Sequence, residues 1–310
     1  MAKIGYIQVI RDCNQNCIIC SNPTNEKTLS LKEAKIKIDE LKAQGYTGVI
    51  LTGGEPTLYV QLPALIAYAI KQKISPRIIT NGQKIADKKY LQTLHAAGLR
   101  HLHLSVFSLQ EKVQVKIARY SPSFQNIKKA LDNLKEAGDI TVDINTAISK
   151  YNADHLSKTV AWIVQKYPFI KHFVFNNLDP YMNRVSENPE VVPNFNDFEL
   201  ELHRALEYLE KNNKTFRVER VPLCYLTDFE HVSTETRKIV KEEGRTVCFL
   251  DDKGTITQDD WFYKKTDTCQ KCSLKKICAG LYAQGGFYKE SELYAVFINQ
   301  RKIIEKIKKD

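Results

Sequence analysis

The feature that most constrains the fold is a regular alternation of short β-rich runs and helical segments over about the first 180 residues. Each apolar, β-branched run indicates a strand, and the segment that follows it has helical periodicity. Ser30-Leu-Lys-Glu33, for example, is a capping box that predicts a helix reaching about Gln44. The expected strands lie at 4–10, 48–51, 77–80, 101–107, 141–147 and 172–176.

Six strand–helix units follow from this pattern, the last helix lying at about 195–212. Such alternation predicts parallel strands joined by right-handed crossovers, and the apolar strands suit a sheet covered by helices. Six units are too few to close an eight-unit barrel. We therefore expect an α/β fold, an open (β/α)6 partial TIM barrel with its site at the carboxyl ends of the strands.

The pattern changes after about residue 213. A strand is expected at 215–221, a short helix at 233–243, and a hairpin with strands at 246–250 and 255–263. A cysteine-rich loop follows. We therefore expect two domains, a large one over 1–212 and a small α+β one over 213–310.

Composition limits the setting of the protein. No apolar run approaches the roughly 18–20 residues of a membrane-spanning helix, and the first residues lack the pattern of a signal peptide. We expect a cytoplasmic protein with no membrane partner. The formal charge of +10 fits a soluble Lys-rich surface or an anionic partner. A nucleic acid is the less favoured partner, because aromatic and basic residues are not interleaved.

The eight cysteines carry most of the chemical information, and a cytosolic chain of this size has little reason to pair them as disulfides. Short spacings in a reducing compartment indicate metal or cluster ligation. They are Cys13, Cys17, Cys20, Cys224, Cys248, Cys269, Cys272 and Cys278.

The first group, Cys13-Asn-Gln-Asn-Cys17-Ile-Ile-Cys20, directly follows the first expected strand. Three thiolates on a four-iron cluster leave one iron open for a substrate or cosubstrate. A structural zinc wants four ligands, and no histidine precedes His95 to complete such a site. The second expected strand ends in Gly53-Gly54-Glu55-Pro56, where glycines allow a ligand or another backbone to approach closely.

With these two motifs, residues 1 to about 210 resemble the radical S-adenosylmethionine (SAM) superfamily. Thr80-Asn-Gly82 and a fourth strand with serines, 102–108, support the resemblance. One position departs from it, because the residue before the third cysteine is usually aromatic and here is Ile19. That position packs near the adenine of SAM, so the change alters a contact and removes no ligand.

The resemblance implies a [4Fe–4S] cluster and SAM as cofactors and a reducing electron from a flavodoxin- or ferredoxin-type donor. SAM would be cleaved reductively to a 5′-deoxyadenosyl radical that abstracts a substrate hydrogen atom. The residues it implies for the cluster are Cys13, Cys17 and Cys20. Those it implies for SAM are Gly53, Gly54 and Glu55 at the methionine amine, and Ser105 or Ser108 with Asn145 at the ribose.

Each of these SAM-site residues also has a purely structural interpretation. Ser105 and Ser108 are three residues apart, so on a regular strand they cannot point the same way, and one of them is expected to cap a helix or brace a loop. Asn145 could satisfy a strand end, and Glu55 could cap a helix.

The second group, Cys269, Cys272 and Cys278, has CX2CX5C spacing after the expected hairpin. From the residues alone, a zinc ribbon competes with an iron–sulfur site. Radical SAM enzymes with a SPASM or shortened twitch extension carry auxiliary clusters on such loops, so the resemblance implies one auxiliary [4Fe–4S] cluster. Its fourth ligand would be Cys224, which we favour, or Cys248.

The leftover cysteine, Cys248 on this interpretation, is either a buried small apolar residue or a hydrogen-atom donor to a substrate radical. We expect an enzyme, and a ribosomally made peptide as its substrate, modified by oxidative cross-linking or epimerisation. Alternatives are a sugar or nucleotide, a cofactor precursor, or tRNA. A non-enzymatic zinc or iron–sulfur protein is disfavoured, because it has no use for a Gly-Gly-Glu loop beside a three-cysteine loop.

Overall fold

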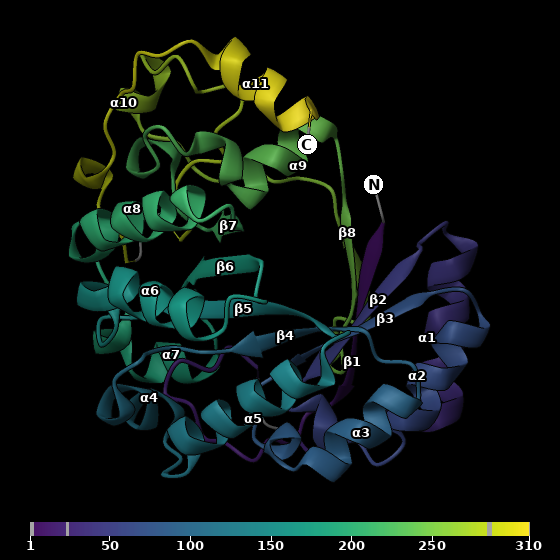
Figure 1. The fold of residues 1–310 in the computed structure, drawn as a ribbon. Coiled ribbons are helices and arrows are strands. Elements are labelled where there is room, and N and C mark those ends of the chain that lie inside the picture. Colours follow the sequence, from purple (N-terminus) through teal and green to yellow (C-terminus); the bar gives the residue numbers. More distant parts are fainter. Residues whose placement is uncertain (1–2, 23–24, 284–286, 310) are drawn as a thin grey trace.

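The computed structural model describes residues 3–22, 25–283 and 287–309 (Figure 1). Its framework is one nine-stranded sheet with the strand order β7-β6-β5-β4-β3-β2-β1-β8-β9. Neighbours from β7 to β8 are parallel, and only β8 and β9 are antiparallel. The strands are β1 (Ile4–Ile10), β2 (Gly48–Gly53), β3 (Ser75–Thr80), β4 (His101–Ser105), β5 (Thr141–Ile148), β6 (His172–Asn177), β7 (Thr215–Glu219), β8 (Arg245–Cys248) and β9 (Thr255–Gln258).

Helices cover the outer face of this curved sheet, as expected for a partial barrel (Figure 1). The capping box that was predicted at Ser30 is present, since the Ser30 hydroxyl accepts from Glu33 N at 3.2 Å and Glu33 Oε2 accepts from Ser30 N at 2.8 Å. The helices are α1 (Leu31–Ala43), α2 (Leu62–Lys71), α3 (Lys88–Ala96), α4 (Glu111–Ala118), α5 (Ser123–Ala137), α6 (Leu156–Lys166), α7 (Asn183–Glu187), α8 (Phe195–Lys211), α9 (Thr234–Lys241), α10 (Asp267–Gln270) and α11 (Gln300–Lys309). In the part of the chain that is described, no helix is long and apolar enough to cross a membrane.

Alternate side chains on each strand face the helices and the barrel interior. On β4, Leu102 and Leu104 are fully buried under the helices. His101, His103 and Ser105 point the other way and stay partly exposed, because the open barrel does not fill its own interior. The strands therefore present polar groups to the inside of the barrel.

The sheet continues past the domain boundary expected at residue 212. β7 pairs in parallel with β6, and β8 pairs in parallel with β1. The hairpin that was predicted after residue 245 is confirmed, with shorter strands, as β8 and β9. The second cysteine group lies beyond this sheet, among short helices at the end where α10 and α11 are labelled in Figure 1.

Candidate active site

The first cysteine group lies at the carboxyl ends of the parallel strands, where a site is expected in this fold. It borders a cavity of about 200 Å³. The cavity brings together eight residues singled out from the sequence. They are Cys13, Cys17, Cys20, Gly53, Gly54, Glu55, Ser105 and Asn145.

The two glycines hold the β2 loop against the backbone just before the cysteines. Gly54 N donates to Ile10 O at 2.7 Å, and Glu55 N donates to Asp12 O at 2.8 Å. A Cβ on Gly54 would lie 2.2 Å from Arg11 O, and one on Gly53, whose φ is +136°, would lie 2.0 Å from Ile10 O. Only glycine fits both positions, so this motif fixes where the cysteine loop starts.

Glu55 joins the β2 loop to the end of β3. Its buried carboxylate accepts from Thr57 N at 3.0 Å, Thr57 Oγ1 at 2.6 Å, Thr80 Oγ1 at 2.7 Å and Asn81 N at 2.7 Å. Burial raises the pKa of Glu55, and these donors oppose that shift. Glu55 therefore braces two strand ends that line the cavity, in addition to lining it itself.

A short row of polar side chains crosses the cavity from β4 to β6. Ser105 and Asn145 are register partners on β4 and β5. Asn176 on β6 donates from Nδ2 to Asn145 Oδ1 at 2.5 Å, which leaves the Asn145 amide nitrogen free to face the cavity. Asn176 was missed from the sequence, although the alternation of faces on β6 and its place at the strand end could have identified it.

Ser108 lies away from this cavity. It is fully buried, its Oγ lies 2.7 Å from His155 Nε2, and Gln110 N donates to it at 2.9 Å. Ser108 therefore braces a loop, which is the structural role expected for one of the two serines. Ser105 is therefore the serine that the fold offers to the cavity.

The thiols of the first group suit a cluster better than a single ion. In a tetrahedral zinc site the sulfurs lie about 3.8 Å apart, given Zn–S bonds of roughly 2.3 Å. Among the described residues, no three cysteine sulfurs fall within 4.8 Å of one another. Burial raises the pKa of Cys13 to about 11 and also raises that of Cys17, so the thiolates need a cationic centre to form. Ile19, only 7% exposed, lines the same cavity.

The second cysteine group forms a separate site. Cys224, Cys269, Cys272 and Cys278 line one small cavity, to which Cys224 comes from the short turn Leu223–Tyr225. Backbone amides point at two of the sulfurs, Gly280 N at Cys278 and Val296 N at Cys272, each at 3.4 Å. Such N–H···S contacts are a usual means of holding iron–sulfur thiolates and tuning their clusters.

Cys248 lies at neither site. On β8 it is the register partner of Ile7 and of Thr255, and its nearest charged groups are Lys37 and Glu40 of α1. The side chain is 5% exposed and faces the helix layer outside the barrel. Its position therefore offers no route to a substrate radical in the barrel, and it matches the alternative of a buried apolar residue.

Two further residues that the sequence did not reveal hold the cysteine loop in place. Asn22 donates from Nδ2 to Gly53 O at 2.8 Å and accepts from Arg11 Nη1 at 3.1 Å. The Arg11 side chain is only 1% exposed and pairs with Asp251 in the β8–β9 turn at 3.2 Å. No local pattern signals this contact, because its partners are 240 residues apart.

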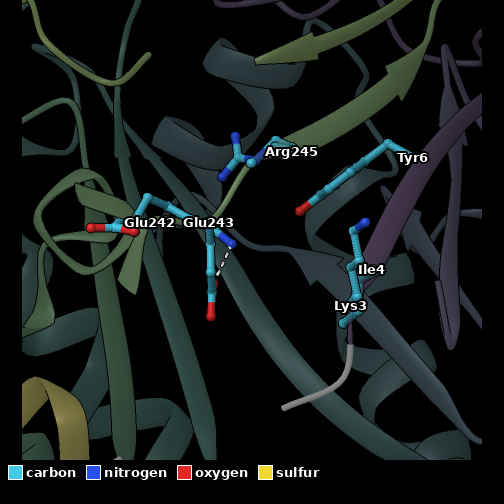
Figure 2. A pocket seen from close by; sticks show the side chains of 8 residues that line it. Lys3, Ile4, Tyr6, Glu242, Glu243 and Arg245 are labelled. Carbon is cyan, nitrogen blue, oxygen red and sulfur yellow. Dashed lines mark hydrogen bonds and ion pairs between the residues drawn. The ribbon is translucent and has the colours of Figure 1, made fainter. Parts of the chain in front are cut away.

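A larger cavity, of about 460 Å³, opens at the other end of the barrel (Figure 2). Lys3, Ile4, Tyr6 and Arg245 border it at the amino ends of β1 and β8. Arg245 is held by Glu219 at 2.8 Å. Because sites in parallel α/β barrels form at the carboxyl ends of the strands, we assign the chemistry to the smaller, cysteine-lined cavity.

Together the fold and the site define a class of protein, an open parallel barrel with a three-cysteine loop beside a Gly-Gly-Glu turn. The model of the radical SAM superfamily matches residues 7–163, about half of the chain. The chain belongs to the radical SAM superfamily. It is an enzyme that uses a [4Fe–4S] cluster and SAM.

Curated relatives cover several chemistries. The AdoMet-dependent heme synthase of Methanosarcina barkeri is 25% identical over 92% of this chain and 93% of its own length. The GTP 3′,8-cyclase of Chlorobaculum tepidum is 33% identical, but the match spans only 45% of this chain and 43% of that protein.

Solved structures match along nearly the whole chain. Streptococcus suis SuiB bound to S-adenosylmethionine has a TM-score of 0.68 at 18% identity, covering 96% of this chain and 76% of SuiB. SuiB has also been solved with its precursor peptide SuiA, with a TM-score of 0.67. Native anSMEcpe with bound AdoMet and the Cp18Cys peptide has a TM-score of 0.67 at 16% identity. The match covers 99% of this chain and 97% of anSMEcpe. At these identities the similarity shows the shared fold.

The residues present fit the cofactors. Cys13, Cys17 and Cys20 would hold the cluster, and Gly53, Gly54, Ser105 and Asn145 would meet SAM. When bound, these groups supply a reductively formed 5′-deoxyadenosyl radical for hydrogen-atom abstraction. The chain's own contribution is to fix the loop through Gly53, Gly54 and Asn22, and to orient the Asn145 amide through Asn176.

Proposed function

We propose that this radical SAM enzyme modifies a ribosomally made peptide by oxidative cross-linking. An auxiliary [4Fe–4S] cluster held by Cys224, Cys269, Cys272 and Cys278 would assist by accepting or relaying an electron. A flavodoxin- or ferredoxin-type protein would supply the electron that starts each turnover.

The observation that carries the proposal is a further cavity, of about 280 Å³, beside the cysteine-lined cavity, which we call the SAM cavity. The two cavities share Ser21 and Asn22. Polar side chains line the further cavity, among them Lys253 and the amides of Gln8, Asn22 and Asn183, which hydrogen-bond one another and the backbone in this structure. Tyr181, at its rim, is 57% exposed. An extended chain could therefore enter beside the SAM cavity and leave to solvent, whereas a small metabolite would need a more enclosed pocket.

The structural relatives support the same choice, since SuiB and anSMEcpe share the fold across the carboxy-terminal region and have been solved with peptides. A second candidate is a step of heme synthesis, favoured by the match along 93% of the heme synthase. The two candidates differ in the substrate that stimulates SAM cleavage.

The test is anaerobic reconstitution followed by reduction with SAM present. About eight irons per chain and release of 5′-deoxyadenosine are expected. Short peptides encoded beside the gene should raise the rate of 5′-deoxyadenosine release and lose the mass of two hydrogen atoms for each cross-link formed. Stimulation by an iron porphyrin precursor, with no peptide effect, would instead favour the heme step. A chain that held zinc and released no 5′-deoxyadenosine would contradict both candidates.

A further inference from the structure

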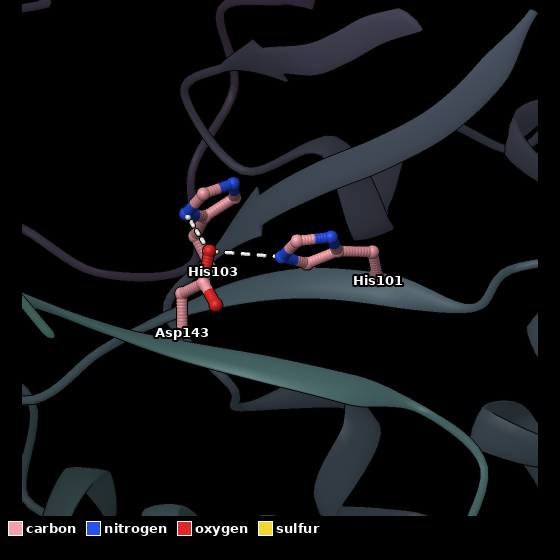
Figure 3. A group of neighbouring side chains, drawn as sticks. All are labelled: His101, His103 and Asp143. Atoms are coloured by element: carbon pink, nitrogen blue, oxygen red, sulfur yellow. Dashed lines mark hydrogen bonds and ion pairs between the residues drawn. The ribbon is translucent and has the colours of Figure 1, made fainter. Parts of the chain in front are cut away.

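A second group of potential ligands lies inside the barrel. His101 and His103 on β4 and Asp143 on β5 face one another there (Figure 3). Asp143 Oδ2 lies 2.8 Å from His101 Nε2 and 3.3 Å from His103 Nδ1, and the two rings stack with centroids 5.3 Å apart. His103 and Asp143 are register partners two residues before Ser105 and Asn145. The group therefore lies on the same inner face, just below the SAM cavity.

The donor set is that of a transition-metal site. Two imidazole nitrogens and one carboxylate oxygen lie within 4.8 Å of one another. Their side chains are only 19%, 13% and 6% exposed. Two histidines and one carboxylate with open positions are typical of catalytic zinc and of non-heme iron(II).

Without an ion the group is poorly satisfied. A single carboxylate oxygen faces both rings, and His103 Nε2 is buried with no hydrogen-bond partner among the described residues. A buried polar atom without a partner is destabilising. With an ion bound, His101, His103 and Asp143 would each bond to the metal, and the two rings would no longer share Asp143 Oδ2. His103 Nε2 would still need a water or a substrate group as its partner.

The surrounding charges limit which ion fits. Arg77 on β3 offsets the charge of Asp143, and His172 on β6 is the other titratable group whose charge acts on it. With little net negative charge, the group would not hold Mg²⁺ or Ca²⁺, which need several oxygen ligands. Zinc and iron(II), which bind imidazole well, suit it.

We propose that His101, His103 and Asp143 bind one divalent transition-metal ion, with zinc as the probe metal, inside the barrel below the SAM cavity. An ion with open positions there would bind and polarise an oxygen of the substrate. The proposal is independent of the proposed function, because metal binding is measured without SAM or substrate.

The experiment uses the full-length protein with both clusters reconstituted, so that the cysteines are occupied. Zinc is added, free metal is removed by chelation and desalting, and retained zinc is counted. Cobalt(II) is the second probe, because its high-spin EPR signal is visible beside oxidised [4Fe–4S] clusters, which are EPR-silent. The variants are His101→Ala, His103→Ala and the near-isosteric Asp143→Asn. The control is His95→Ala, which removes a surface histidine paired with Asp139 at 2.7 Å.

We expect about one zinc per chain in the wild type and in His95→Ala. Each triad variant should lower the affinity by roughly 100-fold or more, beyond the 10–100-fold typical of changes to a ligand's supporting partner. Asp143→Asn keeps the side-chain shape, so a loss there with unchanged iron content is not a folding effect. Absence of bound zinc and cobalt in the wild type, or equal retention in the triad variants, would overturn the proposal.

Discussion

At the scale of single residues, the two cysteines outside the cysteine runs are equally buried but lie in different surroundings, so their variants can be compared. Cys224 is 7% exposed and lies with Cys269, Cys272 and Cys278, whereas Cys248 is 5% exposed and faces α1. We predict that Cys224→Ala lowers the iron content below about eight per chain and changes the EPR signal of the auxiliary cluster, because that cluster loses its fourth ligand. Cys248→Ala should keep both clusters and the product. Iron analysis and EPR of the reduced protein measure this, and the reverse pattern would refute the ligand assignment.

The buried carboxyl of Glu235 gives a prediction about how the stability of the protein depends on pH. Burial, with Glu219 nearby, raises the pKa of its carboxyl to about 7. The folded state therefore keeps a proton that the unfolded state loses above about pH 4.5. Stability should fall as the pH rises from about 4.5 to 7 and then level off. Glu235→Gln cannot ionise and should be more stable than wild type at pH 8, by roughly 1–3 kcal/mol.

Thermal unfolding under anaerobic conditions at pH 5 and pH 8 tests this prediction. The two proteins should differ little at pH 5, because Glu235 is protonated in the folded state there. Glu207→Gln, a change on the exposed face of α8, serves as the control for the lost charge. Equal stability of wild type and Glu235→Gln at both pH values would contradict the buried, protonated carboxyl.

At the scale of elements, the β2 loop and the cysteine loop act as one unit. Gly54→Ala would place a Cβ 2.2 Å from Arg11 O and 2.3 Å from Asp12 O, so one loop must move. We predict a loss of about 2–4 kcal/mol of stability and a loss of SAM cleavage, because the displaced segment leads directly into Cys13. Unfolding experiments and 5′-deoxyadenosine release measure the two effects.

Gly45→Ala is the matched control for Gly54→Ala. Gly45 has a φ of +78° but no atom within 4 Å of an added Cβ. The Gly45→Ala variant should therefore lose only about 1 kcal/mol of stability, from the strain of that backbone, and should keep SAM cleavage. Similar losses of activity in both variants would show that the close backbone contact at Gly54 has no special role.

Local patterns predicted the elements well and their distant contacts poorly. The capping box at Ser30 and the alternating strand–helix units depend on neighbouring residues, so the sequence reveals them. The place of β8 beside β1 depends on pairing across about 240 residues, which no local pattern encodes. In the site, spacing singled out Cys13, Cys17 and Cys20, whereas the pairing of Arg11 with Asp251 joins residues 240 positions apart and has no local signal.

At the scale of the whole molecule, the region after residue 212 extends the open barrel as well as carrying the second cysteine group. β7 pairs with β6 and β8 pairs with β1, so these strands cover both edges of the sheet made by β1 to β6. Gln8 in β1 accepts from Leu250 N at 3.1 Å, and Arg11 meets Asp251 at 3.2 Å. The cysteine loop is therefore held partly by residues that come more than 200 positions later.

This dependence predicts the behaviour of two fragments. Fragment 1–212 would expose the edges of β1 and β6 and leave the buried Arg11 without Asp251, so we expect it to aggregate and to hold no stable cluster. Fragment 1–263 keeps β7, β8 and β9 but lacks the second cysteine run. It loses core side chains such as Leu274, Tyr288 and Ile307, but it keeps the strands beside β1 and β6 and should hold about four irons per chain. Size-exclusion chromatography and iron analysis distinguish the two. A soluble, monomeric 1–212 fragment holding four irons would show instead that the barrel folds independently at the boundary expected from the sequence.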